Sequence, residues 1–211
     1  MGRKEKDRRR IEDVRLEILQ AAKKLFLKEG FEATSIRKIA AQIKLSPTTI
    51  YLYYKDKNDI AYTLHKEGFK ILGEQFSVLR HVESGFERLK AMGRIYLDFA
   101  THNTDFYQLM FIMKEPMDFI SGKDSCEWEE GEIAFGALQQ IVLACKAEGY
   151  FKGLNENSVA LNIWALVHGL CSLKLQGHLD HVASAHLNVP ADRNVLEEAF
   201  ETLVLMLDKM K

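Results

Sequence analysis

Hydroxyl, aromatic and basic side chains are concentrated in residues 46–57, which read Ser-Pro-Thr-Thr-Ile-Tyr-Leu-Tyr-Tyr-Lys-Asp-Lys. Hydroxyl and ammonium groups donate to phosphate oxygens, and a threonine can contact a base edge through its methyl or hydroxyl group. The chain has no nucleophile elbow, phosphate-binding glycine loop, H-E-x-x-H or dinucleotide fingerprint. We therefore expect a nucleic-acid-binding protein and not an enzyme.

Two short helices joined by a tight turn would hold these side chains in place. The first would cover residues 35–42, capped by Thr34 or Ser35. Its apolar positions recur at helical spacing and are Ile36, Ile39, Ala40 and Ile43. The second would start at Ser46, with Pro47 at the first helical position, where no donor is missed. This is the layout of a helix-turn-helix, whose second helix lies in the major groove of DNA.

Another helix is expected directly after this pair. Asp56 would cap it, and Lys57 would stand in its first turn and face the phosphate backbone. The alternative for this stretch is an ordinary solvated turn. The apolar pattern continues to residue 76, which predicts one long helix that leaves the DNA-binding domain without a flexible linker.

Residues 18–60 resemble the N-terminal domain of the TetR family of transcriptional repressors. The shared motifs are A-A-x-x-L-F, G-F-x-x-T-S, an I-A core pair, T-I-Y-x-Y-Y and K-x-K-x-x-I. The resemblance implies a helix-turn-helix domain over residues 1–57. Carried over by position, it implies DNA contacts from Ser35, Arg37, Pro47, Thr48, Thr49, Tyr51, Leu52, Tyr53 and Lys57.

Two residues depart from the family pattern. Lys44 stands where the family usually has a glycine in the turn. Either Lys44 adopts a left-handed conformation, at a cost of roughly 1 kcal/mol, or the turn differs. Tyr53 replaces a frequent histidine, which keeps a hydrogen-bonding tip and loses the positive charge that a histidine can carry.

Composition and charge favour an all-helical protein with two functional parts. The 211 residues are 47% apolar, contain only three prolines and show no strong alternation of β-branched residues. We expect about nine helices, with residues 58–211 forming a helical effector-binding and dimerisation domain. Residues 1–65 carry a net charge of +6 and the remainder −7. A basic part joined to an acidic one suits separate DNA-facing and ligand-facing or partner-facing units.

The N-terminus and the cysteines indicate where the protein works. The basic residues 2–10 form either a solubilising tail or an arm that reaches along a narrow minor groove. Cys126, Cys145 and Cys171 have no spacing typical of a zinc site or a disulfide framework. We expect a cytoplasmic protein without export signal, and no apolar run reaches the length of about 18 residues that spans a bilayer.

Further helices are expected after residue 84. Ser84 and Glu87 have capping-box spacing and would begin a fifth helix, and a sixth would hold residues 106–113. Residues 128–148 would form a seventh helix, with Ile133 among its inward-facing residues.

The connections in this part are also predicted from composition. Residues 114–127 break the periodicity and predict a mobile connection, which can lie over a pocket. An eighth helix is expected over residues 156–176. Residues 177–190 are expected to form a loop before a final helix that is capped by Asp192.

The eighth helix carries two adjacent stripes, one with Trp164 and His168 and the other with Gly169. A glycine inside a helix costs about 1 kcal/mol relative to alanine, and a close approach of another backbone commonly compensates this cost. The segment Trp-Ala-Leu-Val-His-Gly-Leu also resembles a Trp-His-Gly signature of one TetR subgroup, in which the last two helices of each subunit meet in a four-helix dimer interface. The expected dimer interface consists of Ala165, Gly169, Ser172, Phe200, Leu203, Val204 and Leu207.

By family resemblance, the C-terminal domain encloses a pocket for a small hydrophobic or aromatic effector that releases the operator. The aromatic and thioether side chains that can line it are Phe99, Phe106, Tyr107, Met110, Met113, Trp128, Trp164 and His168. The alternative for each is plain packing in the core.

The sequence leaves two alternative kinds of DNA-binding protein. One alternative is a metal sensor, suggested by three histidines close together in sequence, His178, His181 and His186. Only Asp180 lies near them at a spacing typical of metal ligands. We therefore expect these histidines on a surface loop, and we expect neither a metal nor a cofactor. An architectural DNA binder without effector would need only to dimerise. The sequence thus favours a ligand-responsive repressor that binds a palindromic double-stranded operator as a homodimer and has no membrane partner.

Overall fold

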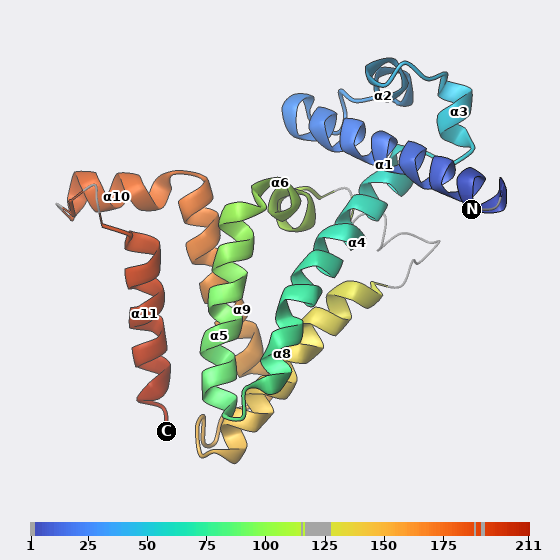
Figure 1. Ribbon diagram of the computed structural model, residues 1–211. Coiled ribbons are helices and arrows are strands. Elements are labelled where there is room, and N and C mark those ends of the chain that lie inside the picture. The colour runs from blue at the N-terminus through green and yellow to red at the C-terminus, as the bar shows by residue number, and fades with distance from the viewer. Residues whose placement is uncertain (1–2, 115, 117–127, 188, 191–192) are drawn as a thin grey trace. The chain divides into compact units, whose positions relative to one another are not determined.

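The computed structural model describes residues 3–114, 116, 128–187, 189–190 and 193–211, with side chains from residue 11 onward (Figure 1). Helices connected by turns make up these ranges, and no strand occurs within them. The chain divides into two compact units. The N-terminal unit comprises Met1–Phe69 and Asp105–Trp128, and the C-terminal unit comprises Lys70–Thr104 and Glu129–Lys211. Because the described residues form helices and no strand, the prediction of an all-helical fold is confirmed.

The N-terminal unit is built around a helix-turn-helix. Its first helices are α1 (Arg3–Glu29), α2 (Ile36–Gln42), α3 (Pro47–Tyr51) and the first part of α4 (Lys57–Phe76). α1 ends before Gly30, whose φ of 85° suits the left-handed residue that commonly follows a helix. The residues that α1 to α4 bury completely include Ile18, Ala22, Ile39, Ile50 and Ile60. α4 is continuous through residue 76, as the apolar pattern predicted.

The turn between α2 and α3 contains the departure that the sequence singled out. Lys44 has a φ of 56°, so this lysine occupies the left-handed region that glycine usually fills. Its side chain is exposed, and its backbone N–H donates to the carbonyl of Ala41 at 3.3 Å. Of the two alternatives, the first is confirmed: the turn keeps its geometry and the lysine bears the conformational strain.

A second segment completes the N-terminal unit. α6 (Thr104–Tyr107) continues as one π-helical turn, η2 (Gln108–Ile112). Leu109 is fully buried in the same core as α1 to α4. A Cβ on Gly68 of α4 would lie 2.5 Å from Sδ of Met110, so the glycine permits this close packing. The predicted sixth helix is confirmed, and its π-helical turn is a feature that often marks functional sites.

The C-terminal unit is a helical bundle. Its elements are the end of α4, η1 (Ser77–His81), α5 (Gly85–His102), α8 (Glu129–Ala147), α9 (Glu156–Leu175), α10 (His178–His186) and α11 (Val195–Asp208). α5 packs against α8 and α9, and α9 also contacts α8, α10 and α11 (Figure 1). The buried core of the C-terminal unit includes Phe86, Leu89, Val142, Phe151 and Ala160.

Three expectations for this unit are wrong. The loop expected over residues 177–190 instead contains α10, which follows Gly177 in a left-handed conformation and buries only Ala183. A helix with so little buried surface leaves a weak apolar pattern. α11 is capped by the side chain of Asn194, whereas Asp192 lies outside the described residues. Ile133 is 62% exposed, because α8 turns a different face inward at its start.

The expectation about membrane spans is also corrected. By length and composition alone, α9 is apolar enough to cross a membrane. Its apolar residues are interrupted by Asn157, Asn162 and His168, so an uninterrupted run does not reveal it. A core helix of a soluble protein passes the same test, and α9 packs against four other helices of its unit. This one helix is therefore weak evidence for a membrane location.

Two of the three cysteines lie in the described part of the chain. Cys145 and Cys171 are buried free thiols, and burial raises the pKa of each to about 12, which makes them unreactive. Cys126 and most of the predicted mobile connection at 114–127 lie outside the described residues.

Candidate functional site

α3 presents most of its short length to solvent. Ser46 caps it by accepting the N–H of Thr49 at 3.0 Å, and Pro47 occupies the first helical position, both as predicted. Only Ile50 is fully buried. Thr48 is exposed, and Tyr51 is 56% exposed. One buried residue thus anchors a helix whose hydroxyl-bearing face is exposed and can enter a DNA groove.

The start of α2 carries a second group of exposed side chains. The side chain of Ser35 caps α2 by accepting the N–H of Lys38 at 3.3 Å. Arg37 is exposed. Lys38 is bound elsewhere, because its ammonium donates to Glu29 and to the carbonyl of Ala33, both at 2.8 Å. Of the two adjacent cations on α2, Arg37 is therefore the one available to a phosphate.

Lys57 is positioned by contacts within the unit. Asp56 caps α4 by accepting the N–H groups of Asn58 at 2.8 Å and Asp59 at 3.0 Å, as predicted. The ammonium of Lys57 donates to the carbonyl of Phe31 at 3.1 Å and lies 4.1 Å from the centroid of its ring. These contacts tie the start of α4 to the turn after α1 and hold the ammonium in one place.

The nine predicted DNA contacts all lie in the N-terminal unit: at the cap and first turn of α2, on α3, in the turn after α3 and at the first residue of α4. The exposed ones are Ser35, Arg37, Thr48, Tyr51 and Leu52. The partly buried ones are Pro47, Thr49, Tyr53 and Lys57. Leu52 is 78% exposed, so its side chain is accessible to a partner.

An aromatic cluster in the N-terminal unit holds one effector candidate. The indole N–H of Trp128 donates to Nε2 of His65 at 2.9 Å, and His65 is fully buried. Phe69 lies edge-on to Trp128 at 5.7 Å and to Phe111 at 5.4 Å. The sequence analysis missed His65, Phe69 and Phe111, although the spacing of four residues between His65 and Phe69 is a signal that places both on one face of α4.

The other effector candidates are divided between the two units. In the N-terminal unit Tyr107 and Met110 are buried, whereas Phe106 and Met113 are partly buried. In the C-terminal unit Phe99 is buried.

Trp164 and His168 belong to a polar and aromatic group within the C-terminal unit. Nδ1 of His168 lies 3.0 Å from the hydroxyl of Tyr96, and burial lowers the pKa of this imidazole. The ring of Trp164 lies 6.2 Å from that of His168 and 5.9 Å from that of Phe135. Tyr96 and Phe135 were not predicted as part of this group, because their contacts with α9 join distant segments.

The residues expected at a dimer interface differ in exposure. Ala165 is exposed, Gly169, Ser172, Val204 and Leu207 are partly buried, and Phe200 and Leu203 are buried within the C-terminal unit. A Cβ on Gly169 would meet no described atom within 4 Å. The close approach that this glycine permits is therefore not used by the described part of its own chain. Exposed apolar residues on the same two helices are Leu161, Leu166, Leu173, Leu205 and Met206.

The histidine group lies on α10 and not on a loop. The rings of His181 and His186 are 6.1 Å apart. Among the described residues, no group of three or more histidine, cysteine, aspartate or glutamate side chains is arranged to hold a metal ion.

Comparison with known proteins identifies the family. The family model described as "Bacterial regulatory proteins, tetR family" matches residues 18–62. The model described as "Tetracyclin repressor-like, C-terminal domain" matches residues 89–205, more than half of the chain. The chain belongs to the TetR family. It is accordingly a TetR-type transcriptional regulator, and the family evidence points away from an enzyme.

Individual relatives agree with this assignment. The HTH-type transcriptional regulator HbdR of Aromatoleum sp. (strain CIB) is 41% identical over 172 residues, which cover 77% of this chain and 73% of HbdR. The fatty acid metabolism regulator protein of Bacillus subtilis (strain 168) is 38% identical over 52 residues, or 25% of this chain and 27% of that protein.

A solved structure shares the fold. The transcriptional regulator FadR from Bacillus subtilis, in complex with stearoyl-CoA, has a TM-score of 0.68 and 15% sequence identity, and the match covers 93% of this chain and 99% of FadR. TetR-family regulators are soluble cytoplasmic proteins that bind DNA and small-molecule effectors and are usually dimers.

Proposed function

We propose that this TetR-family regulator is a ligand-responsive repressor that binds a palindromic operator as a homodimer and leaves it when a small hydrophobic effector binds. The observation that carries this proposal is α3, a helix capped at Ser46 and anchored by Ile50, whose remaining surface carries exposed hydroxyl groups. A helix of five residues buries little surface of its own, so these hydroxyl groups are available to a DNA groove.

The proposed DNA contacts have distinct roles. Pro47 and Thr48 stand at the start of α3, where short side chains let the backbone approach base edges. Thr49, Tyr51 and Tyr53 would bind phosphate or base groups through their hydroxyls. The remaining contacts would come from Ser35, Arg37, Leu52 and Lys57. The contacts of Lys57 with Phe31 orient its ammonium before DNA arrives, which lowers the entropy cost of binding a phosphate.

Dimerisation would make one short reading helix sufficient. A two-fold pair reads two half-sites about 34 to 36 Å apart, or a multiple of that distance. The proposed interface is formed by α9 around Ala165, Gly169 and Ser172 and by α11. The exposed Leu161, Leu166 and Leu173 of α9 and Met206 of α11 lie on the same two helices. The open space over Gly169 supports the approach of a partner helix. The segment from Trp164 to Gly169 further supports membership in the Trp-His-Gly subgroup.

The effector would be a hydrophobic molecule that contacts aromatic and methionine side chains of residues 58–211. Fatty acid regulators among the relatives, and the stearoyl-CoA bound to FadR, support an acyl thioester of coenzyme A as the class to test first. His168 and Tyr96 offer a polar pair beside Trp164, where an aromatic acyl group or a carbonyl oxygen can be bound.

Release of DNA would follow from a shift between two states of the dimer. α4 is one helix whose residues belong to both units, so a change in its position alters the DNA-binding domain at residues 1–57. The size of the shift is limited by the difference in effector affinity between the two states.

The test has two stages and uses the full-length protein. Random duplexes would be selected for binding at low ionic strength, and the enriched fragment would then be titrated with acyl-CoA thioesters of different chain type, with free coenzyme A as the control. The proposal expects a palindromic fragment and its release by a thioester but not by coenzyme A. Release by zinc or nickel would favour a metal sensor, and failure of every compound would favour an architectural DNA binder.

A further inference from the structure

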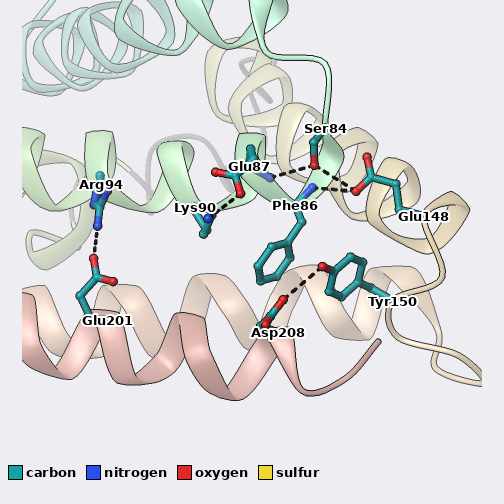
Figure 2. A network of polar contacts seen from close by, with 9 residues as sticks. All are labelled: Ser84, Phe86, Glu87, Lys90, Arg94, Glu148, Tyr150, Glu201 and Asp208. Carbon is teal, nitrogen blue, oxygen red and sulfur yellow. Dashed lines mark hydrogen bonds and ion pairs between the residues drawn. The ribbon is translucent and has the colours of Figure 1, made fainter.

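A groove of about 700 Å³ lies in the C-terminal unit between the first half of α5 and the last half of α11. Its lining includes Val204, which was predicted at the dimer interface, and none of the side chains proposed above as DNA or effector contacts. Figure 2 shows the polar contacts that surround it, from Ser84 and Glu148 at one end to Arg94 and Glu201 at the other.

The floor of the groove is aromatic. The rings of Phe86 and Tyr150 are stacked, with centroids 4.5 Å apart and an interplanar angle of 3°. Phe86 belongs to the first turn of α5, and Tyr150 follows Gly149 after α8. The walls add aliphatic surface from Ile95 on α5 and from Leu205 on α11, which is 62% exposed. The groove thus offers apolar surface to an elongated ligand.

The two cationic side chains in the wall are already bound to carboxylates. Nζ of Lys90 lies 2.6 Å from Oε1 of Glu87. The guanidinium of Arg94 donates to Glu201 and lies 3.5 Å from Glu197, and these glutamates raise its pKa. An incoming anion would have to break one of these ion pairs, so the groove disfavours anionic ligands.

Asp208 provides the remaining charge. Its Oδ1 accepts a hydrogen bond from the hydroxyl of Tyr150 at 3.2 Å. Burial and the neighbouring Asp208 both raise the pKa of Tyr150, so the phenol stays neutral and does not compensate the carboxylate. Within the described part of the chain, no salt bridge ends at Asp208. The lining therefore holds one more carboxylate than cations, with Glu87, Glu201 and Asp208 against Lys90 and Arg94.

The aromatic faces themselves attract cations in this structure. Nζ of Lys211 lies 5.2 Å from the centroid of Tyr150, and Nζ of Lys90 lies 5.6 Å from that of Phe86. Cations within about 6 Å of a ring face are attracted by its quadrupole. A ligand with a positive head that takes the place of Lys211 would meet the same attraction and the carboxylate of Asp208 as well.

We propose that this groove binds an amphipathic organic cation, with its ammonium head between Asp208 and the face of Tyr150 and its apolar body along Leu205 and Ile95. The site is separate from the proposed effector contacts, and binding at it does not depend on the proposed repressor function.

The test uses benzyltrimethylammonium as the probe, full-length protein without DNA, and methyl spectra of isotope-labelled isoleucine and leucine. Saturable shifts at Leu205 and Ile95 are expected, whereas the anion 3-phenylpropionate should produce none. Asp208→Asn should weaken binding about three- to fivefold. The matched control Asp98→Asn removes an exposed carboxylate from α5 away from the groove and should leave the affinity unchanged.

A second variant separates loss of the site from loss of folding. Tyr150→Phe keeps the aromatic floor and frees Asp208 from its hydrogen bond, so it should bind the probe at least as tightly as the parent protein. Unchanged thermal unfolding would show that Asp208→Asn is folded. The proposal is overturned if the probe shifts no methyl group of the groove, if 3-phenylpropionate binds equally well, or if the two aspartate variants lose affinity to the same extent.

Discussion

The carboxylate of Glu148 accepts a hydrogen bond from the backbone N–H of Gly85, so the residue that follows α8 caps the N-terminus of α5. Its other oxygen accepts from the hydroxyl of Ser84 at 3.1 Å and from the N–H of Phe86 at 3.3 Å (Figure 2). Helix N-termini stabilise negative charge through these free N–H groups and through the helix dipole. One side chain therefore joins two helices that are distant in sequence.

This cap predicts a pH-dependent contribution to stability. The hydrogen bond from Gly85 is the main cause that lowers the pKa of Glu148 from its ordinary value of 4.5. A lowered pKa in the folded state means that the stabilisation is complete above about pH 4.5 and is lost as the pH falls through the folded-state value. Glu148→Gln should therefore lower the thermal midpoint at pH 7 by more than it does at pH 3.5.

Glu17→Gln is the control for this measurement, because Glu17 is an exposed glutamate in the interior of α1, away from any helix N-terminus. Its thermal midpoint should follow that of the parent protein at both pH values. An equal loss at pH 7 and pH 3.5 for Glu148→Gln would mean that the carboxylate charge does not stabilise α5.

A second prediction concerns the close approach at Gly85. A Cβ at this position would lie 2.7 Å from the backbone carbon of Ala144 and from the backbone nitrogen of Cys145. Backbone atoms cannot give way as a flexible side chain can, so Gly85→Ala should destabilise the fold by about 1–3 kcal/mol. Gly136→Ala is the matched control, since its Cβ would meet nothing within 4 Å, and it should be neutral or stabilising. Denaturant unfolding of both variants decides, and equal stabilities would contradict the packing argument.

Lys44 leads to a prediction of the opposite sign. Its φ of 56° lies in the left-handed region, where a side chain costs roughly 1 kcal/mol relative to glycine. Lys44→Gly should raise the free energy of unfolding by about that amount, less the entropy that glycine adds to the unfolded chain. Lys55→Gly tests an exposed lysine without a positive φ and should not stabilise the protein. A lower thermal midpoint for Lys44→Gly would contradict the inferred strain.

The proposed dimer can be tested at Ala165. This residue is exposed on α9, and a glutamate there would place two like charges against each other across a two-fold interface. Ala165→Glu should convert the dimer to a monomer in light scattering and should weaken operator binding. Gln140→Glu adds the same charge at an exposed position on α8 and should remain dimeric. A dimeric Ala165→Glu would exclude this face as the interface.

Local signals explain what could be predicted. The caps at Ser46 and Asp56 and the stop at Gly30 depend on residues close in sequence, and each was predicted and then found. The left-handed Lys44 was one of two alternatives that the sequence left open. The fold class followed from composition and helical periodicity. The family resemblance added the DNA-binding positions, which remain predictions.

Long-range contacts explain what could not be predicted. The capping-box spacing of Ser84 and Glu87 correctly indicated the start of α5, but the carboxylate that completes the cap comes from Glu148, 64 residues after Ser84. The bond between His65 and Trp128 likewise joins residues 63 positions apart. α10 was missed because only one of its residues is buried. Such features depend on tertiary packing, which a periodic pattern does not contain.

We propose above that exposed side chains of α3 contact the bases and phosphates of the operator, and equilibrium binding to the selected operator tests these contacts most directly. Thr48→Ala combined with Tyr51→Ala removes two exposed groups and leaves Ser46, Ile50 and the core intact, so the thermal midpoint should stay within about 2 °C of the parent value. We expect the double variant to bind the operator at least tenfold more weakly than the parent protein does, with a scrambled duplex as the reference for nonspecific binding. An unchanged affinity in this folded double variant would contradict it.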